Sequence, residues 1–217
     1  MRVVTGEAKG RKLKSPKSAG TRPIIDRVKT ALFDILADEV EDARFLDLFG
    51  GVGGVGIEAL SRGASGATFI EMNYKVLKIL RENLQITRLA DRAETLHSDA
   101  FKFLQTYAVP APGAVQRAYD IIYVAPPQYQ GMAARTLGIL DSSPLVATPG
   151  LVIIQIHPKE REVVVTTAAS CQRLHLTDER RYGSTLLMFY RTPDEHDERN
   201  DISADNKQEL NATQQEQ

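Results

Sequence analysis

A glycine-rich turn with acidic residues on both sides is the part of this sequence best suited to chemistry. Residues 45–56 read FLDLFGGVGGVG, and Gly51, Gly53 and Gly56 fit the spacing G-x-G-x-x-G. Glycines at this spacing let the backbone turn tightly and approach a ligand. Glu71 follows 20 residues after Gly51, where an acid can accept two ribose hydroxyls. The pattern predicts a site for a cofactor that contains a nucleoside; the alternative is a glycine turn without a ligand.

Asp47 distinguishes between two classes of such cofactor. It stands four residues before Gly51, near the end of a predicted strand. A dinucleotide would place its pyrophosphate at this turn, where a carboxylate repels it. S-adenosylmethionine (SAM) has no phosphate and carries an ammonium and a sulfonium, which a carboxylate attracts. Asp47 therefore favours SAM over NAD.

Asp99 is a third candidate acid, and no residue pattern predicts a metal. Asp99 ends a predicted strand, so its carboxylate could accept the adenine amino group, cap the next helix, or do both. The four histidines have no paired spacing, and Cys171 is the single cysteine. We therefore expect no metal site and no internal disulfide.

The elements that must position these residues alternate along the chain. Apolar segments of strand length occur at 45–49, 67–71, 94–97, 119–124 and 151–156. Helical periodicity occurs at about 24–40, 54–62, 74–86, 99–107 and 131–140. Two further strands, at about 172–178 and 184–190, are predicted to pair as an antiparallel hairpin. The fold class is α/β, with a seven-stranded, mostly parallel sheet and right-handed crossovers.

Length and composition exclude several classes of protein. The chain has 217 residues and a mass of 24.0 kDa, with 42% hydrophobic and 25% charged residues, as in one globular domain. No stretch reaches the roughly 18 apolar residues of a membrane helix, and the first residues have no apolar leader segment. We expect a cytoplasmic protein with no membrane partner.

Charge is distributed unevenly along the chain. Residues 1–29 hold nine Lys or Arg and two acids, whereas residues 193–217 hold eight acids and two bases. The tail has too few large apolar residues to offset its ordering entropy, so we predict that it is disordered. We divide the chain into a basic N-terminal extension (1–23), a main domain (24–192) and an acidic tail (193–217). The basic extension favours a polyanion partner, and a solvated surface is an equal alternative.

Several separated segments resemble the RsmD-type methyltransferases, which transfer a methyl group from SAM to the exocyclic N2 of a guanine in 16S ribosomal RNA. The resemblance covers about residues 2–191. It rests on the segments VVTGEAKGRKLKSPK, TRPIIDRVKTALFDIL, FLDLFGGVGGVGIEALSRGA, FIEMN, SDAF and RRYGSTLLMFY. It implies a class I SAM-dependent methyltransferase of Rossmann-like fold, acting as a cytoplasmic monomer on 16S rRNA or the small ribosomal subunit.

The resemblance also implies roles for individual residues. The expected cofactor-binding residues are Asp47, Phe49, Gly51, Gly53, Glu71, Met72, Asp99 and Ala100. The expected catalytic segment is Ala125, Pro126, Pro127, Gln128 and Tyr129. The expected RNA-binding residues are Lys9, Arg11, Lys12, Arg22 and Arg27.

The catalytic segment departs from the family pattern of Asn or Asp, Pro, Pro, then Tyr or Phe. Ala125 replaces the polar residue and Gln128 replaces the aromatic one. An active enzyme could use backbone carbonyls and the Gln128 amide oxygen to orient the amino group, with Tyr129 stacking on the extruded base. The alternatives are a protein that binds SAM and RNA with weakened or lost catalysis, and a methyltransferase with another acceptor, such as a DNA adenine. An NAD(P)-dependent oxidoreductase is a further alternative.

Overall fold

A seven-stranded sheet forms the centre of the molecule. The computed structural model describes residues 1–16, 26–108 and 117–193. The strand order is β3-β2-β1-β4-β5-β7-β6. The strands are β1 Arg44–Asp47, β2 Gly66–Glu71, β3 Ala93–His97, β4 Tyr119–Val124, β5 Val146–Ile156, β6 His175–Tyr182 and β7 Thr185–Arg191. The predicted seven-stranded, mostly parallel sheet is confirmed.

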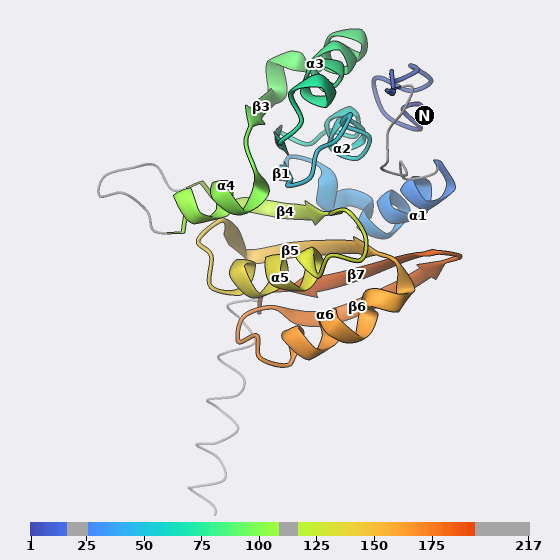
Figure 1. Cartoon of the computed structure of the whole chain (residues 1–217). Helices are drawn as coiled ribbons and strands as arrows, with labels where there is room; N and C mark the ends of the chain where they lie inside the picture. Colours follow the sequence, from blue (N-terminus) through green and yellow to red (C-terminus); the bar gives the residue numbers. More distant parts are fainter. Residues whose placement is uncertain (17–25, 109–116, 194–217) are drawn as a thin grey trace, which may run out of the picture.

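The parallel strands bring the predicted site residues together at the carboxyl ends of the strands. Strand β1 pairs with β2 on one side and with β4 on the other, and Asp47 stands opposite Tyr123 of β4. Strand β5 pairs in parallel with β4, and the arrows of β4 and β5 point to the same side in Figure 1. The antiparallel pairs β5–β7 and β7–β6 confirm the predicted hairpin.

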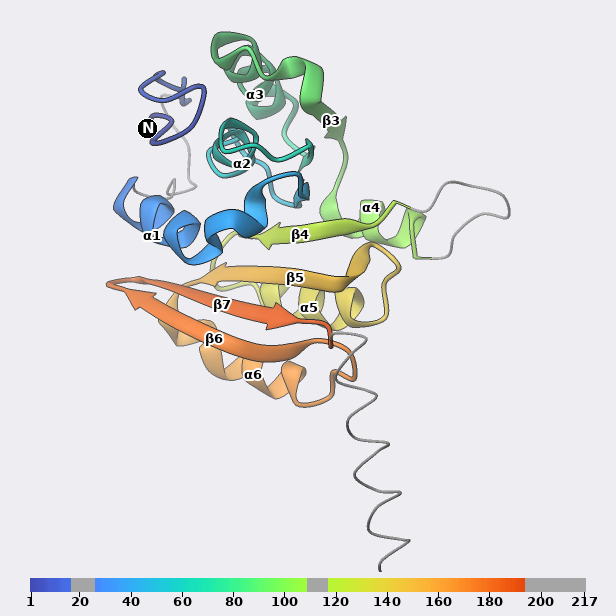
Figure 2. The same ribbon diagram turned by 180° about the vertical axis from the view of Figure 1, so that it is seen from behind.

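Helices cover both faces of the sheet. Figures 1 and 2 show α1, α2 and α3 on one face and α4, α5 and α6 on the other. The helices are α1 Asp26–Leu36, α2 Gly56–Ser61, α3 Tyr74–Thr87, α4 Ala100–Thr106, α5 Met132–Asp141 and α6 Arg161–Ala168. Side chains of β4 alternate between the two apolar clusters: Ile121 and Tyr123 join one, Ile122 and Val124 the other. None of the described helices is both long and apolar enough to cross a lipid bilayer.

Element bounds differ from the predictions at several places. Helix α6 was not predicted, and β6 begins and ends later than the expected 172–178. Strand β5 begins at Val146, earlier than expected, and contains a cis peptide bond between Thr148 and Pro149. The helix expected over 24–40 is α1 followed by a 3₁₀ turn, Ala37–Val40. Residues 24–25 and the acidic segment 194–217 lie outside the described residues.

Residues 1–16 fold back as a small hairpin that packs on the domain. Arg2 and Lys12 form an antiparallel bridge. Val3, Ala8 and Leu13 are 1%, 1% and 7% exposed, and they join the apolar cluster that includes residues of α1, α2 and α3. Figures 1 and 2 both place this hairpin beside α2. Residues 1–23 were predicted to form an extension; the described part of this segment, residues 1–16, packs on the domain.

Glu58 of α2 fixes the hairpin. Its Oε2 accepts hydrogen bonds from the Val4 backbone N–H at 2.8 Å, and its Oε1 from the Thr5 N–H at 2.9 Å. The Lys29 ammonium lies 3.0 Å from Oε2 and the Arg62 guanidinium 3.2 Å from Oε1. The Glu58 and Lys29 side chains are both fully buried. One buried carboxylate therefore joins the hairpin, α1 and α2.

Candidate active site

Glycine stands at three positions of the turn after β1 for different physical reasons. Gly51 has φ +53°, and a Cβ there would come no closer than 3.9 Å to any other atom considered, so its outer side is open. Gly53 has φ +85°, and its Cβ would lie 2.4 Å from the Leu80 side chain of α3. A Cβ at Gly56 would lie 2.3 Å from the Phe69 ring of β2. Only Gly51 faces open space; the other two are required by packing.

Asp47 is a buried carboxylate at the start of this turn. It is 2% exposed, and its Oδ2 accepts a hydrogen bond of 3.2 Å from the Gly56 backbone N–H. Burial raises the pKa of Asp47 to about 7; the Gly56 N–H opposes this rise and the Glu71 charge adds to it. Burial and the Asp47 charge also raise the pKa of Tyr123, which stands opposite on β4. A cation bound next to Asp47 would stabilise its ionised form.

Glu71, at the end of β2, spans the turn and the start of α3. Its Oε2 accepts from the Gly51 N–H at 3.0 Å, and its Oε1 from the Asn73 N–H at 2.6 Å. Asn73 caps α3 by accepting from the backbone N–H groups of Lys75 and Val76. Glu71, which stands 20 residues after Gly51 in the sequence, thus contacts the glycine turn directly.

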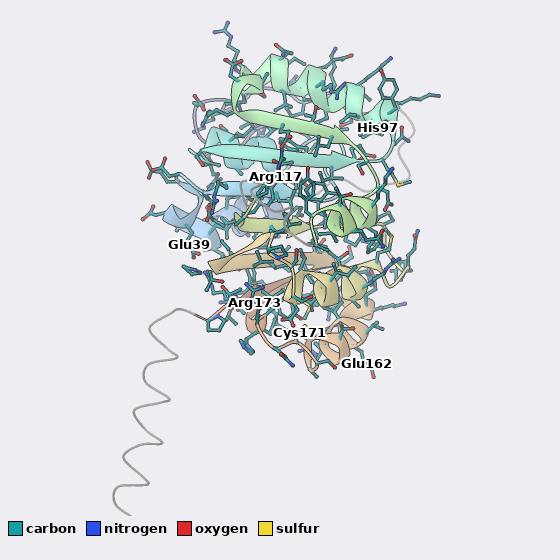
Figure 3. The ribbon with its side chains drawn as sticks, turned by 90° about the vertical axis from the view of Figure 1, so that its left-hand side faces the viewer. Glu39, His97, Arg117, Glu162, Cys171 and Arg173 are labelled. Carbon is teal, nitrogen blue, oxygen red and sulfur yellow. The ribbon has the colours of Figure 1, made fainter. Side chains whose placement is uncertain are left out.

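Met72 is held next to Glu71 with its side chain exposed. Its side chain is 66% exposed, and its carbonyl lies 2.9 Å from the His97 Nε2. The His97 ring also packs on Tyr74, with 5.4 Å between ring centroids. Figure 3 shows His97 at the end of the sheet near α3. Phe49, another expected cofactor residue, is partly buried and packs on the cluster beneath α4 and α5.

Asp99 caps α4, as one of its two predicted roles requires. Its Oδ1 accepts from the Phe101 N–H at 2.9 Å and from the Lys102 N–H at 3.0 Å. Both hydrogen bonds end on the same oxygen, which leaves Oδ2 to accept a donor from a ligand. Ala100 is 5% exposed and belongs to the core. The Ser98 N–H donates to the Glu71 carbonyl at 3.3 Å, so the segment before Asp99 lies beside the end of β2.

The segment after β4 lies next to the acidic turn. Because β4 pairs with β1, Ala125 follows close to the end of the strand that carries Asp47. Ala125 is partly buried and packs on the apolar cluster beneath α1 and α3. Pro126 is buried, while Pro127 and Gln128 are exposed. The two prolines fix the backbone φ of this segment and present its end to solvent.

Tyr129 is the residue in this segment with the least usual conformation. Its φ is +63°, in the left-handed region that side chains other than glycine rarely adopt. Its side chain is 61% exposed, and its ring lies 5.3 Å from the His157 ring. Its backbone N–H donates to the Glu160 Oε1 at 3.0 Å. Sequence reasoning missed Glu160 and His157, although His157, Pro158 and Glu160 carry the signature of a helix start.

The expected RNA-binding residues fall into three groups. Lys9, Lys12 and Arg27 are exposed. Arg11 is partly buried and donates to the Ile86 carbonyl of α3 at 2.7 Å, so one of its N–H donors is already used within the protein. Arg22 lies outside the described residues.

Within residues 1–16, 26–108 and 117–193, no group of three or more His, Cys, Asp or Glu side chains could hold a metal ion. The acids Asp47, Glu71 and Asp99 each accept backbone N–H groups instead. The arrangement suits an organic ligand that carries hydroxyl, amino and cationic groups.

Comparison with known sequences gives matches over most of the chain. A protein-family model described as "Conserved hypothetical protein 95" matches residues 1–191. The Escherichia coli K12 protein "Ribosomal RNA small subunit methyltransferase D" is 38% identical over 155 residues, which are 71% of this chain and 74% of that protein. The Bacillus subtilis protein "Putative rRNA methyltransferase YlbH" is 31% identical over 191 residues, which are 88% of this chain and 98% of that protein.

Solved structures share the fold. The structure titled "Putative methyltransferase yhhF from Escherichia coli" superposes with a TM-score of 0.71 at 31% identity, covering 90% of this chain and 99% of that one. A Salinibacter ruber RNA methyltransferase in complex with S-adenosyl-L-homocysteine has a TM-score of 0.57 at 14% identity, covering 80% of this chain and 95% of that one. The second likeness concerns the fold alone.

Proposed function

Because the chain belongs to the RsmD-type family of SAM-dependent rRNA methyltransferases, we propose that it methylates the exocyclic N2 of a guanine in 16S rRNA. Methylation of rRNA with SAM is the activity of the family. The guanine N2 acceptor, the 16S rRNA target and the roles of individual residues are the proposal.

The observation that best supports this proposal is that the ends of three neighbouring strands lie side by side. Asp47 ends β1, Glu71 ends β2 and Ala125 follows β4, and β1 is hydrogen-bonded to both of the other strands. A cofactor held by the two acids would therefore lie beside the segment after β4. Holding a methyl donor and its acceptor side by side removes much of the entropic cost of their reaction.

The acids fit the polar groups of SAM. In this proposal Glu71 accepts the two ribose hydroxyls, Asp47 faces the cationic end, and the free oxygen of Asp99 accepts the adenine amino group. Gly51 offers the open backbone that a close ligand needs. Phe49, Gly53, Met72 and Ala100 complete the surroundings of the cofactor. When bound, SAM supplies an electrophilic methyl group on a positively charged sulfur.

The segment after β4 would position the guanine amino group. This group is a weak nucleophile because its lone pair is delocalised into the ring. The carbonyl oxygens of Ala125 and Pro126 and the amide oxygen of Gln128 would accept its N–H bonds and favour the pyramidal geometry of attack. Pro127 keeps the segment rigid, and Tyr129 would stack on the extruded base. The amino group loses its proton after attack, so no strong base is required.

The positive residues would contact the RNA backbone. Lys9, Lys12 and Arg27 are exposed, and with Arg11 and Arg22 they would bind phosphates. The substrate in this proposal is 16S rRNA or the small ribosomal subunit, bound by a single copy of the chain.

A second function, binding of SAM and RNA with weak or no catalysis, has one observation in its favour. The Ala125 side chain packs on an apolar cluster and offers no hydrogen-bond acceptor where the family has Asn or Asp. Loss of one preorganised polar group costs about 10²–10³ in rate. An NAD(P)-dependent oxidoreductase is disfavoured by the family and by the buried Asp47 carboxylate.

Mass spectrometry of nucleosides separates these functions. Purified protein is incubated with SAM and either unmethylated 16S rRNA or small subunits, and the RNA is digested. We expect N2-methylguanosine at one position, and no product with Glu71→Ala, which should also lose SAM binding in calorimetry. Ala125→Asn should raise the rate if the missing acceptor limits catalysis.

Three results would contradict the proposal in different ways. Tight SAM binding without any methylated nucleoside after hours would favour the weak or inactive binder. A methyl group on another base would identify a different acceptor. Full SAM affinity in the Glu71→Ala variant would refute the ribose role of Glu71.

A further inference from the structure

We propose that Glu160 is a positioning residue that fixes Tyr129 and His157 as a preformed stacking surface for the substrate base. This rests on the proposed function, in which Tyr129 faces the extruded guanine. Glu160 lies outside every segment that carries the family resemblance, and it comes from the turn after β5.

One carboxylate joins two neighbouring strand ends. The Glu160 Oε1 accepts from the Tyr129 N–H at 3.0 Å, and its Oε2 accepts from the His157 N–H at 3.3 Å. Tyr129 follows β4 and His157 follows β5, and these strands pair in parallel up to Val124 and Ile154. The loop after β4 is therefore tied to a rigid strand end rather than left to solvent.

The hydrogen bond between Tyr129 and Glu160 offsets an unfavourable backbone conformation. The left-handed φ of +63° at Tyr129 costs free energy for a residue with a Cβ and persists only where surrounding contacts impose it. The hydrogen bond from the Tyr129 N–H to a carboxylate is charge-assisted and hence stronger than a neutral one. Without Glu160 we expect the loop to relax and the Tyr129 ring to leave its position.

His157 is also held by hydrogen bonds at its own turn. Its Nδ1 accepts from the Lys159 backbone N–H at 3.2 Å, so the neutral ring carries its proton on Nε2. The Tyr129 and His157 rings lie 5.3 Å apart at 44°, a tilted aromatic pair. An exposed tyrosine with a fixed backbone and a supporting ring loses little entropy when a base stacks on it.

The test compares Glu160→Ala and Glu160→Gln with Glu162→Gln. Glu162 lies on the first turn of α6, and its side chain projects at the surface in Figure 3. Glutamine at 160 can accept only one of the two N–H groups, so it should have an intermediate effect. Three quantities are measured: the dissociation constant for a 16S rRNA fragment, the dissociation constant for SAM, and the NMR shifts of the His157 ring protons.

We expect Glu160→Ala to weaken RNA binding at least about fivefold, as loss of base stacking does, while SAM binding changes less than twofold. The His157 ring protons should lose the ring-current shift from Tyr129, as they should in Tyr129→Leu. Tyr129→Phe should keep both the shift and the RNA affinity. Glu162→Gln should behave as the wild type.

An unchanged His157 shift in Glu160→Ala, or equal loss of SAM and RNA binding, would overturn the proposal. None of the three measurements requires turnover, so they remain informative if the wild type makes no N2-methylguanosine. In that case the proposed function fails while the stacking surface is still judged by RNA affinity. If the shift is lost but RNA affinity is unchanged, Glu160 only orders the loop and the stacking role is refuted.

Discussion

At the scale of single residues, Asp47 is subject to two opposing demands. A carboxylate in this position suits a cationic ligand, but its burial makes the ionised form costly when no ligand is present. Burial raises the pKa of Asp47 to about 7 from an ordinary value of 3.8. Because the folded-state pKa is the higher one, the folded protein holds the proton more tightly. The contribution of Asp47 to stability is therefore complete below about pH 4 and lost as pH rises through 7.

We therefore compare the free energy of unfolding of Asp47→Asn with that of the wild type. The difference, variant minus wild type, should be up to roughly 4 kcal/mol more favourable to the variant at pH 8 than at pH 4. Denaturant titrations of both proteins across this range measure the difference. The buried amide has its own cost, but that cost does not vary with pH. A difference in stability that is the same at pH 4 and pH 8 would contradict the raised pKa.

Partners that are near in the chain or follow a fixed spacing can be predicted from sequence, and the Asp99 cap is confirmed while the ribose role of Glu71 stays a prediction. Asp99 caps the helix that begins directly after it, and Glu71 reaches the glycine turn at the spacing of a known pattern. Glu58 and Glu160 could not be predicted in this way, because their backbone partners lie 54 and 31 positions away, at Val4 and Tyr129. Such contacts depend on the tertiary fold.

At the scale of elements, a buried ion pair between Glu58 and Lys29 is one of the contacts that attach the N-terminal hairpin. Glu58→Gln would leave the Lys29 ammonium without its carboxylate and remove one acceptor from Val4 or Thr5. We expect a loss of about 3–5 kcal/mol in the free energy of unfolding, as for other broken buried pairs. Urea titration measures it, and amide hydrogen exchange at Val4 and Thr5 should quicken.

Glu82→Gln is the matched control for this variant. Glu82 pairs with Lys14 of the same hairpin, but both side chains are more than half exposed. Its loss should cost less than about 1 kcal/mol. Equal effects of the two substitutions would show that the buried pair does not anchor the hairpin.

Helix α6 shows why some elements were not predicted. Residues 163–167 are a run of β-branched Val and Thr, which favour strands when judged by propensity alone. Only Val164 of this helix is buried, so it has little apolar periodicity to reveal it. The capping box from His157 to Glu160, directly before this helix, favours the helical conformation instead. Local capping and packing against α5 thus outweigh propensity.

At the scale of the whole molecule, the alternation of strands and helices predicted the fold class and the C-terminal hairpin, whereas the charge pattern predicted little about the surface. Nine bases lie in residues 1–29, but Lys29 is fully buried and Lys14 is paired with Glu82. Charge counted along the sequence therefore overstates the charge at the surface. Lys9 and Lys12 are exposed and remain candidates for phosphate contacts.

The double variant Lys9→Ala with Lys12→Ala should reduce the salt dependence of RNA binding. Each phosphate contact contributes about 0.7–0.9 to the slope of log affinity against log salt concentration, so the slope should fall by about 1.5. Fluorescence anisotropy with a 16S rRNA fragment at several salt concentrations measures it. Arg44→Gln is the control, because Arg44 is paired with Asp120 and begins β1, at the other end of the strand from Asp47. A slope unchanged by the double variant would remove the hairpin from the RNA interface.

The hairpin of residues 1–16 also affects how the chain acquires its structure during synthesis. The amides of Val4 and Thr5 bond to Glu58, 54 and 53 positions further along, and Ala8 bonds to Ser61. A nascent chain must therefore extend past α2 before these early residues find their partners. Until then, the apolar side chains of Val3, Ala8 and Leu13 stay open to chaperones.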